Sequence, residues 1–225
     1  MKRRTYLGVV ALALAGCSSD GDNAGPGDAT TGTDGNAGST TSEGGSDPIL
    51  FDGSGETTTD TFELEGGIAA FDMEHAGDGG FQVELVDQSS GNTVEFVANE
   101  MGQWRGRIPY GVDQGTYALA VTAVGDWSVE ISQPRQSGSD ADQPPLSFSG
   151  ESPDYEGPVE FSGETTFAGS YASNGVFNVA VLDPDGNSTS VFSEMRSFEG
   201  EESVEIDGTG WIRVVTNGEW EVEVE

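Results

Sequence analysis

The 225-residue sequence has little cysteine, histidine and lysine, and each shortage excludes a class of site. The single cysteine, Cys17, excludes an internal disulfide framework, a cysteine zinc site and a redox pair of thiols. The single histidine, His75, excludes chemistry that needs two imidazoles. No lysine follows Lys2, and 40 acidic residues against 8 basic ones give a net charge of −32. Nucleic-acid binding needs clustered cations that neutralise phosphates, so this charge excludes nucleic acid as a partner.

The first basic residues belong to a predicted export signal. Lys2, Arg3 and Arg4 precede an apolar run at residues 6–15. As a helix this run would be about 15 Å long, half the thickness of a bilayer core, so it does not predict a spanning helix. The pair Arg3 and Arg4 before an apolar run resembles a twin-arginine export signal.

The residues around Cys17 resemble the lipobox of prokaryotic lipoproteins, in the order Leu14-Ala15-Gly16-Cys17. The resemblance implies that residues 1–16 are a signal peptide and that the chain is cut before Cys17. It further implies that the thiol carries a lipid, which anchors the protein on the extracellular face of the cell membrane. The alternative is an ordinary cleavage site followed by a free cysteine.

Cleavage at this point leaves 5 arginines and 40 acidic residues, a net charge of −35. A chain this acidic, without lysine, resembles the proteins of haloarchaea. At molar salt the Debye length is roughly 3 Å, so repulsion among the carboxylates is screened. In dilute buffer the same repulsion opposes the compact state.

A flexible tether is predicted next, at residues 17–47. Residues 18–47 contain no aromatic and no aliphatic side chain larger than alanine. Such a segment cannot bury enough apolar surface to offset its chain entropy, so we expect it to be disordered. As a flexible coil it has a root-mean-square reach of about 30 Å, which holds the rest of the chain off the lipid surface.

The rest of the sequence contains two copies of one module, predicted at residues 48–133 and 146–225. Residues 134–145, which are polar and flanked by prolines, are the predicted linker. The matches keep their order, and the offset falls from 96 to 93 between predicted strands, where single-residue indels are tolerated. The matching segments are 81–87 with 177–183, 91–92 with 186–187, 100–101 with 194–195, 104 with 198, 106 with 200, 115–116 with 208–209, and 125–131 with 218–224.

Apolar residues alternate with polar ones in both copies, and no helical period occurs. This alternation is typical of strands with one buried and one solvated face. With glycine turns every 8–12 residues, it predicts an all-β chain of two tandem antiparallel β-sandwich domains. The predicted core positions are Phe81, Val83, Leu85, Leu119, Val121, Trp127, Val129 and Ile131, and Phe177, Val179, Val181, Ile212, Val214, Trp220, Val222 and Val224.

The last two strands of each copy are predicted to form a hairpin with a three-residue loop. This register pairs Val121 with Trp127 and Val214 with Trp220, which keeps all of these side chains on the core face. Gly125 and Gly218 end the two loops, and we expect both to have positive φ.

Two polar segments are candidate sites that also have simpler interpretations. His75 ends an alternating strand, and we expect it to be solvated rather than catalytic. Oxygens alternate in Asp183, Asp185 and Asn187, as at the start of a calcium loop, but Pro-Asp-Gly is itself a turn signal. A plain turn is the prediction and a calcium site the alternative. Asn187 also begins the only N-glycosylation sequon.

One outer face of the second module differs from that of the first. If Ile212 and Val214 point inward, then Trp211, Arg213 and Val215 point outward, where the first copy has Ala118, Ala120 and Thr122. Trp and Arg dominate interface hot spots, so this face is the candidate partner contact. Contact with the first module or with the linker is the other interpretation.

The modules resemble pre-peptidase C-terminal type domains, which end in a Gly-x-Trp-x-Val strand like residues 125–129 and 218–222. That resemblance transfers no catalytic residue, so no enzyme activity and no cofactor is predicted. The sequence predicts a surface-anchored binding or scaffold lipoprotein of a halophile, whose partner is a cell-surface protein or polysaccharide. The alternative is an accessory subunit that presents a secreted enzyme or transporter through the Trp211 face.

We predict that the protein loses cooperative structure below a few hundred millimolar KCl, because unscreened carboxylates then repel one another. Thermal unfolding followed by circular dichroism across a KCl series measures this. A melting temperature that does not change with KCl would contradict the prediction.

Overall fold

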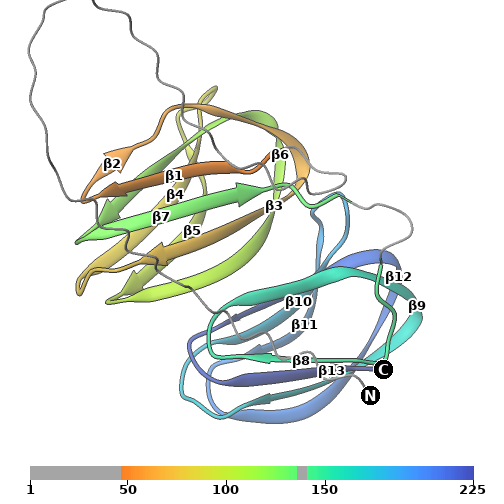
Figure 1. The fold of residues 1–225 in the computed structure, drawn as a ribbon. Coiled ribbons are helices and arrows are strands. Elements are labelled where there is room, and N and C mark those ends of the chain that lie inside the picture. The colour runs from red at the N-terminus through yellow and green to blue at the C-terminus, as the bar shows by residue number, and fades with distance from the viewer. Residues whose placement is uncertain (1–46, 136–140) are drawn as a thin grey trace, which may run out of the picture. The chain divides into compact units, whose positions relative to one another are not determined.

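The computed structural model describes residues 47–135 and 141–225, and all of its regular elements are β-strands (Figure 1). The fold class predicted from the alternating pattern is therefore confirmed. Arg3, Arg4, Cys17 and most of the predicted tether lie outside the described residues.

The first sheet contains β1 (Ile49–Ser54), β2 (Thr57–Thr58), β3 (Phe62–His75), β4 (Gly80–Asp87), β5 (Thr93–Met101), β6 (Trp104–Ala123) and β7 (Asp126–Ser132). The second contains β8 (Leu146–Gly150), β9 (Asp154–Tyr171), β10 (Phe177–Leu182), β11 (Ser188–Glu194), β12 (Phe198–Thr216) and β13 (Trp220–Val224).

The two sheets have the same strand order. The first runs β1-β7-β3-β6-β4-β5, with β2 paired to β6, and the second runs β8-β13-β9-β12-β10-β11. All pairings between these strands are antiparallel. The registers correspond as well, because Val83 pairs with Val121 and Val179 with Val214, the residues that the sequence repeat matches. We call the part of the chain around the first sheet module 1 and the part around the second module 2.

Each sheet curls around its own core. All sixteen predicted core positions are buried. In module 1 the core joins Phe71 of β3 to Val83 of β4, two strands that are not neighbours in the sheet. The long strands bend at glycines in left-handed conformations, at Gly66 and Gly67 in β3 (φ 83° and 86°) and at Gly163 in β9 (φ 88°). Both modules belong to one compact unit, Ser42–Glu225.

The predicted final hairpins are wrong. Trp127 pairs with Gly53 and His75, and Trp220 pairs with Gly150 and Tyr171. In each module the long strand β3 or β9 lies between the last two strands. The reason is that the end of β6 pairs with β4, so the chain crosses to the far side of β3 before β7 begins. The alternation of apolar and polar residues correctly predicted which side chains point inward. It could not predict which strand each of these strands pairs with.

The tryptophan of each last strand lies over a glycine of the edge strand. A Cβ on Gly53 would lie 2.7 Å from Trp127 Cζ2, and one on Gly150 would lie 2.9 Å from Trp220 Cζ2. Trp127 Nε1–H donates to Gly55 O at 3.2 Å, and Trp220 Nε1–H donates to Ser152 O at 2.9 Å. The edge strand thus provides both the space for the ring and the acceptor for its N–H group.

Gly125 and Gly218 differ, although both end a loop at the same place in the repeat. Gly125 has φ 120°, as predicted, whereas Gly218 is not among the glycines with positive φ.

We expect Gly125→Ala to destabilise the protein by about 1–3 kcal/mol, from backbone strain and from a Cβ 2.6 Å from Gly77 Cα. A Cβ on Gly218 would lie 2.8 Å from Ser173 Cβ, so Gly218→Ala is not a clean control. The control is Gly80→Ala, because Gly80 has no positive φ and the nearest atom to its added Cβ would be Met101 Sδ at 3.8 Å, so it should cost less than about 1 kcal/mol. Denaturant unfolding at high KCl measures both, and equal losses would contradict this account.

Candidate functional site

The predicted partner face of module 2 is covered. Trp211 is 1% exposed and packs in a cluster with Ile68 of β3 and Leu182 of β10. The side chain of Trp211 is therefore not open to an external partner. Its side chain does point away from the core of module 2, but module 1 covers it. Of the two interpretations of this face, the structure favours contact with the first module.

The other two residues of this face also contact module 1. Arg213 Nη1 donates to Pro109 O at 3.4 Å, and its guanidinium carbon lies 5.7 Å from the centre of the Tyr110 ring. Val215 packs against the core of module 1. Burial raises the pKa of Tyr110 to about 12, so the ring beside Arg213 stays neutral at physiological pH.

An ion pair also links the two modules. Arg107 Nε and Nη2 of β6 both lie 2.7 Å from Asp154 Oδ1 of β9, and the Arg107 guanidinium lies 4.9 Å from the Tyr155 ring centre. The backbone N–H of Arg107 donates to Pro153 O at 3.0 Å. We call this whole region the joint. Its side chains are Ile68, Arg107 and Tyr110 of module 1 and Asp154, Trp211 and Arg213 of module 2.

A backbone contact completes the joint. The turn between β10 and β11 lies against glycines of module 1. A Cβ on Gly111 would overlap the carbonyl oxygen of Gly186, and a Cβ on Gly67 would lie 2.8 Å from Pro184 O. Only glycine leaves room for this approach of two backbones.

The same turn holds the calcium and glycosylation candidates. The Asp183 carboxylate accepts hydrogen bonds from Asp185 N at 3.0 Å, Asn187 N at 2.9 Å and Asn187 Nδ2 at 2.8 Å. Its oxygens therefore face the N–H groups of their own turn, as in a plain Asx turn. Within residues 47–135 and 141–225, no three His, Cys, Asp or Glu side chains are grouped to hold a metal ion. Asn187 is exposed on this turn.

His75 is 1% exposed, so the prediction of a solvated histidine is wrong. Its ring stacks on Phe81 with centroids 4.9 Å apart and planes 3° apart. Nδ1 lies 2.7 Å from Gly102 O, and Nε2 lies 3.2 Å from Val124 O. In module 2 the equivalent residue is Tyr171, stacked on Phe177 and hydrogen-bonded to Asn217. A buried ring thus closes the same end of both cores, and His75 is a packing residue.

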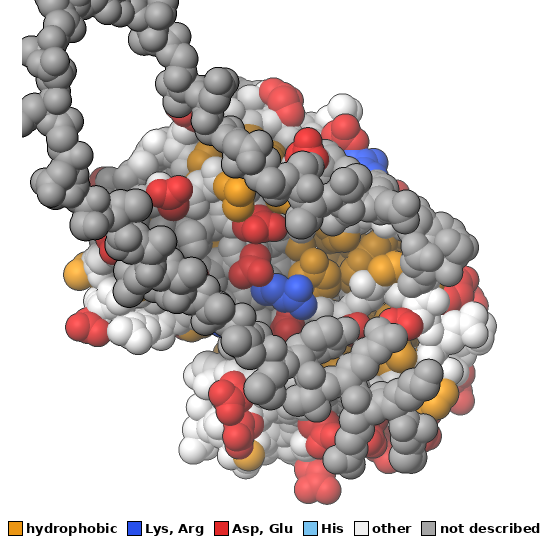
Figure 2. Space-filling view, in the orientation of Figure 1, with side chains coloured by type: hydrophobic (Ala, Val, Ile, Leu, Met, Phe, Trp, Pro, Cys, Tyr) orange, Lys and Arg blue, Asp and Glu red, His pale blue; other side chains and the backbone are white. Residues whose placement is uncertain are grey.

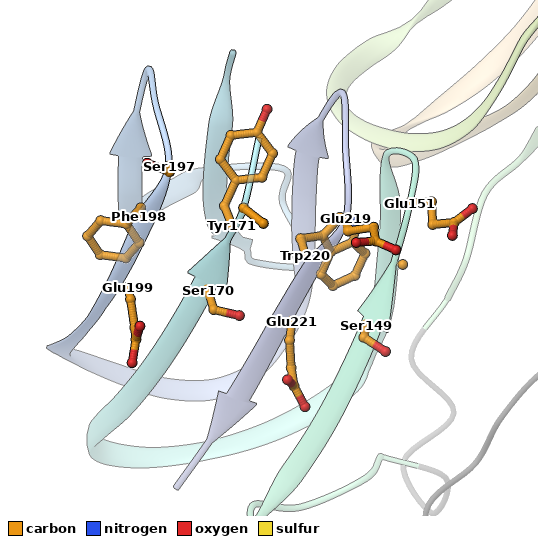
Figure 3. A pocket seen from close by; sticks show the side chains of 12 residues that line it. Ser149, Glu151, Ser170, Tyr171, Ser197, Phe198, Glu199, Glu219, Trp220 and Glu221 are labelled. Carbon is orange, nitrogen blue, oxygen red and sulfur yellow. The ribbon is translucent and has the colours of Figure 1, made fainter. Parts of the chain in front are cut away.

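An acidic groove with a volume of about 760 Å³ lies on the outer face of module 2 (Figure 3). It crosses β8, β13, β9 and β12, whose residues Ser149, Glu221, Ser170 and Glu199 form one row. The serines are short, so the glutamates stand above them as ridges. The other exposed carboxylates of the groove are Glu151 and Glu219.

Sequence reasoning missed this groove, although the repeat contained its signal. Glu199 and Glu201 occupy the places that Arg105 and Arg107 occupy in module 1. There Arg105 Nη2 lies 3.5 Å from Glu74 Oε1 and Arg107 pairs with Asp154, so the equivalent face of module 1 carries both signs of charge. The face of the molecule seen in Figure 2 shows many acidic side chains and few basic ones.

Comparisons with known proteins add little. No protein-family model and no curated protein matches the sequence. The chain is similar to the solved structure of a Cupin 2 conserved barrel domain protein from Leptotrichia buccalis, with 12% identity over 79% of this chain and 81% of that chain and a TM-score of 0.24. It is also similar to the PBSX exported protein XepA, with 10% identity, 79% and 86% coverage and a TM-score of 0.25. Similarity at this level carries no argument about function.

Within the described residues there is no helix long and apolar enough to cross a membrane.

Proposed function

We propose that this chain is a lipid-anchored, non-enzymatic scaffold and binding protein on the extracellular face of a halophile's membrane. The lipobox at Cys17 supports the anchor, and the tether at residues 18–47 supports a position away from the lipid surface. The observation that carries the binding role is the groove on module 2. This groove combines a hollow shape with a row of hydrogen-bonding groups across four strands.

The chemistry of the groove favours a neutral polysaccharide as its ligand. Carboxylate and serine oxygens accept hydrogen bonds from sugar hydroxyls, and bonds to a charged acceptor are stronger than neutral ones. An acidic polymer would be repelled by the four glutamates. The alternative role as an accessory subunit that presents an enzyme through the Trp211 face loses its specific support, because that face is buried.

The anchor is tested by Cys17→Ser, with Ser18→Ala as a control that leaves the thiol in place. Without the thiol no lipid can be attached, so we expect Cys17→Ser to move the protein from the membrane fraction into the medium. Immunoblots of both fractions at growth salinity measure this. A Cys17→Ser protein that still sediments with membranes would disprove the lipid anchor.

The groove is tested by the double variant Glu199→Gln, Glu221→Gln, which we expect to reduce retention on immobilised neutral cell-surface polysaccharide at least tenfold at growth salinity. The loss of two charge-assisted acceptors is the physical reason. The matched control is Glu56→Gln, Asp126→Asn, which removes the same charge from exposed positions of module 1. Equal retention of the two double variants, or no retention of the unmodified protein, would rule out the groove as the binding site.

A further inference from the structure

The scarce cations of this chain are concentrated at the joint. Only five arginines follow residue 4. Arg107 reaches from module 1 to Asp154 of module 2, and Arg213 reaches from module 2 to Pro109 of module 1. Arg135 of the linker pairs with Glu65 beside a cavity of about 250 Å³ that Trp211 also lines.

The two bodies that these arginines join are both strongly negative. Residues 48–133 contain 15 acidic residues and 2 arginines, a net charge of −13. Residues 146–225 contain 17 acidic residues and 2 arginines, a net charge of −15. Two such bodies repel each other in dilute salt, so the contact between them needs local opposite charges or a screening electrolyte.

We propose that the joint is a salt-dependent hinge. It closes at high ionic strength and opens at an intermediate KCl concentration, above the concentration at which the modules themselves unfold, and the Arg107–Asp154 pair sets the salt concentration at which it closes. This inference does not depend on the anchor or on the polysaccharide.

Salt closes the hinge because it screens distant charges before it screens those in contact. The Debye length falls from about 10 Å at 0.1 M to about 3 Å at 1 M. The atoms of the Arg107–Asp154 pair are 2.7 Å apart and lie within that length at both concentrations. Carboxylates spread over the two modules lie farther apart, so their repulsion is lost first.

The modules can separate without unfolding because each has its own sheet and its own core. The cluster between them has only three fully buried apolar residues, Ile68, Leu182 and Trp211. The joint also leaves two buried donors, Trp211 Nε1 and Arg213 Nε, without a hydrogen-bond partner. Opening would let water bind both donors and would recover their desolvation cost.

Arg107 also separates two carboxylates. Asp72 of β3 lies opposite Arg107 in the β3–β6 ladder. Burial, Glu130 and Asp154 raise the pKa of Asp72, and Arg107 opposes them. Without Arg107, the repulsion between Asp72 and Asp154 loses its main opposing cation, because the effect of Arg105 on the pKa of Asp72 is smaller.

The test is a KCl titration of the full chain labelled with 5-fluorotryptophan, followed by fluorine NMR. The Trp211 signal, assigned by its loss in Trp211→Phe, reports the joint, and the Trp127 and Trp220 signals report the two cores. We expect the Trp211 transition at a higher KCl concentration than the other two. Arg107→Gln should raise its midpoint at least twofold, and adding Asp154→Asn should reverse most of that rise.

Arg105→Gln is the matched control, because it removes the same charge two residues away from a pair with Glu74 inside module 1. It should leave the Trp211 midpoint within about a tenth of its original value. Equal shifts for Arg105→Gln and Arg107→Gln would show a general charge effect and overturn the proposal. A single transition shared by the Trp127, Trp211 and Trp220 signals would also overturn it.

A second variant opens the hinge without any change of charge. Gly111→Ala places a methyl group against the Gly186 carbonyl, so we expect an exposed Trp211 signal at every KCl concentration at which the cores are folded. Gly80→Ala is its control, since the nearest atom to a Cβ there is Met101 Sδ at 3.8 Å. A buried Trp211 signal in Gly111→Ala would overturn the geometry on which the hinge rests.

Discussion

The alternation of buried and exposed residues along each strand is the constraint on which the rest of this structure depends. In strands that carry many of the 40 acidic residues, a core forms because alternate positions hold apolar side chains. The last strand, β13, shows this directly, because Trp220, Val222 and Val224 are buried while Glu221 and Glu223 are exposed. The inward rows build two separate cores, and the outward rows carry the carboxylates, including those of the groove.

The same alternation explains what could be predicted from the sequence. It identified the all-β class and all sixteen core positions, since period two depends only on neighbours along the chain. It could not choose strand neighbours, because a residue such as Trp127 points inward whether it pairs with Val121 or with His75. The wrong prediction of the final hairpins follows from this. The wrong prediction of a positive φ at Gly218 has the same origin, because that φ depends on the path of the chain after β12.

The burial of Trp211 and of His75 could not be inferred from the alternation alone. Their burial depends on residues distant in sequence, namely Ile68 for Trp211 and the carbonyls of Gly102 and Val124 for His75. The alternation along β12 correctly predicted that the Trp211 side chain points away from the core of module 2. It carried no information about which residues of module 1 cover that side chain. The acidic character of the groove could have been predicted, because the repeat aligns Glu199 of module 2 with Arg105 of module 1. Its hollow shape could not, because it depends on a row of residues from four strands.

The glycine contact at the joint also bears on which module such a turn can dock on. Module 1 offers the facing pair Ile68 and Gly111 to the β10–β11 turn, whereas the equivalent pair in module 2 is Glu164 and Glu205. A turn that docked on module 2 in the same way would therefore meet two carboxylates where the present turn meets an isoleucine and a glycine. This mode of docking is therefore specific to the face that module 1 presents.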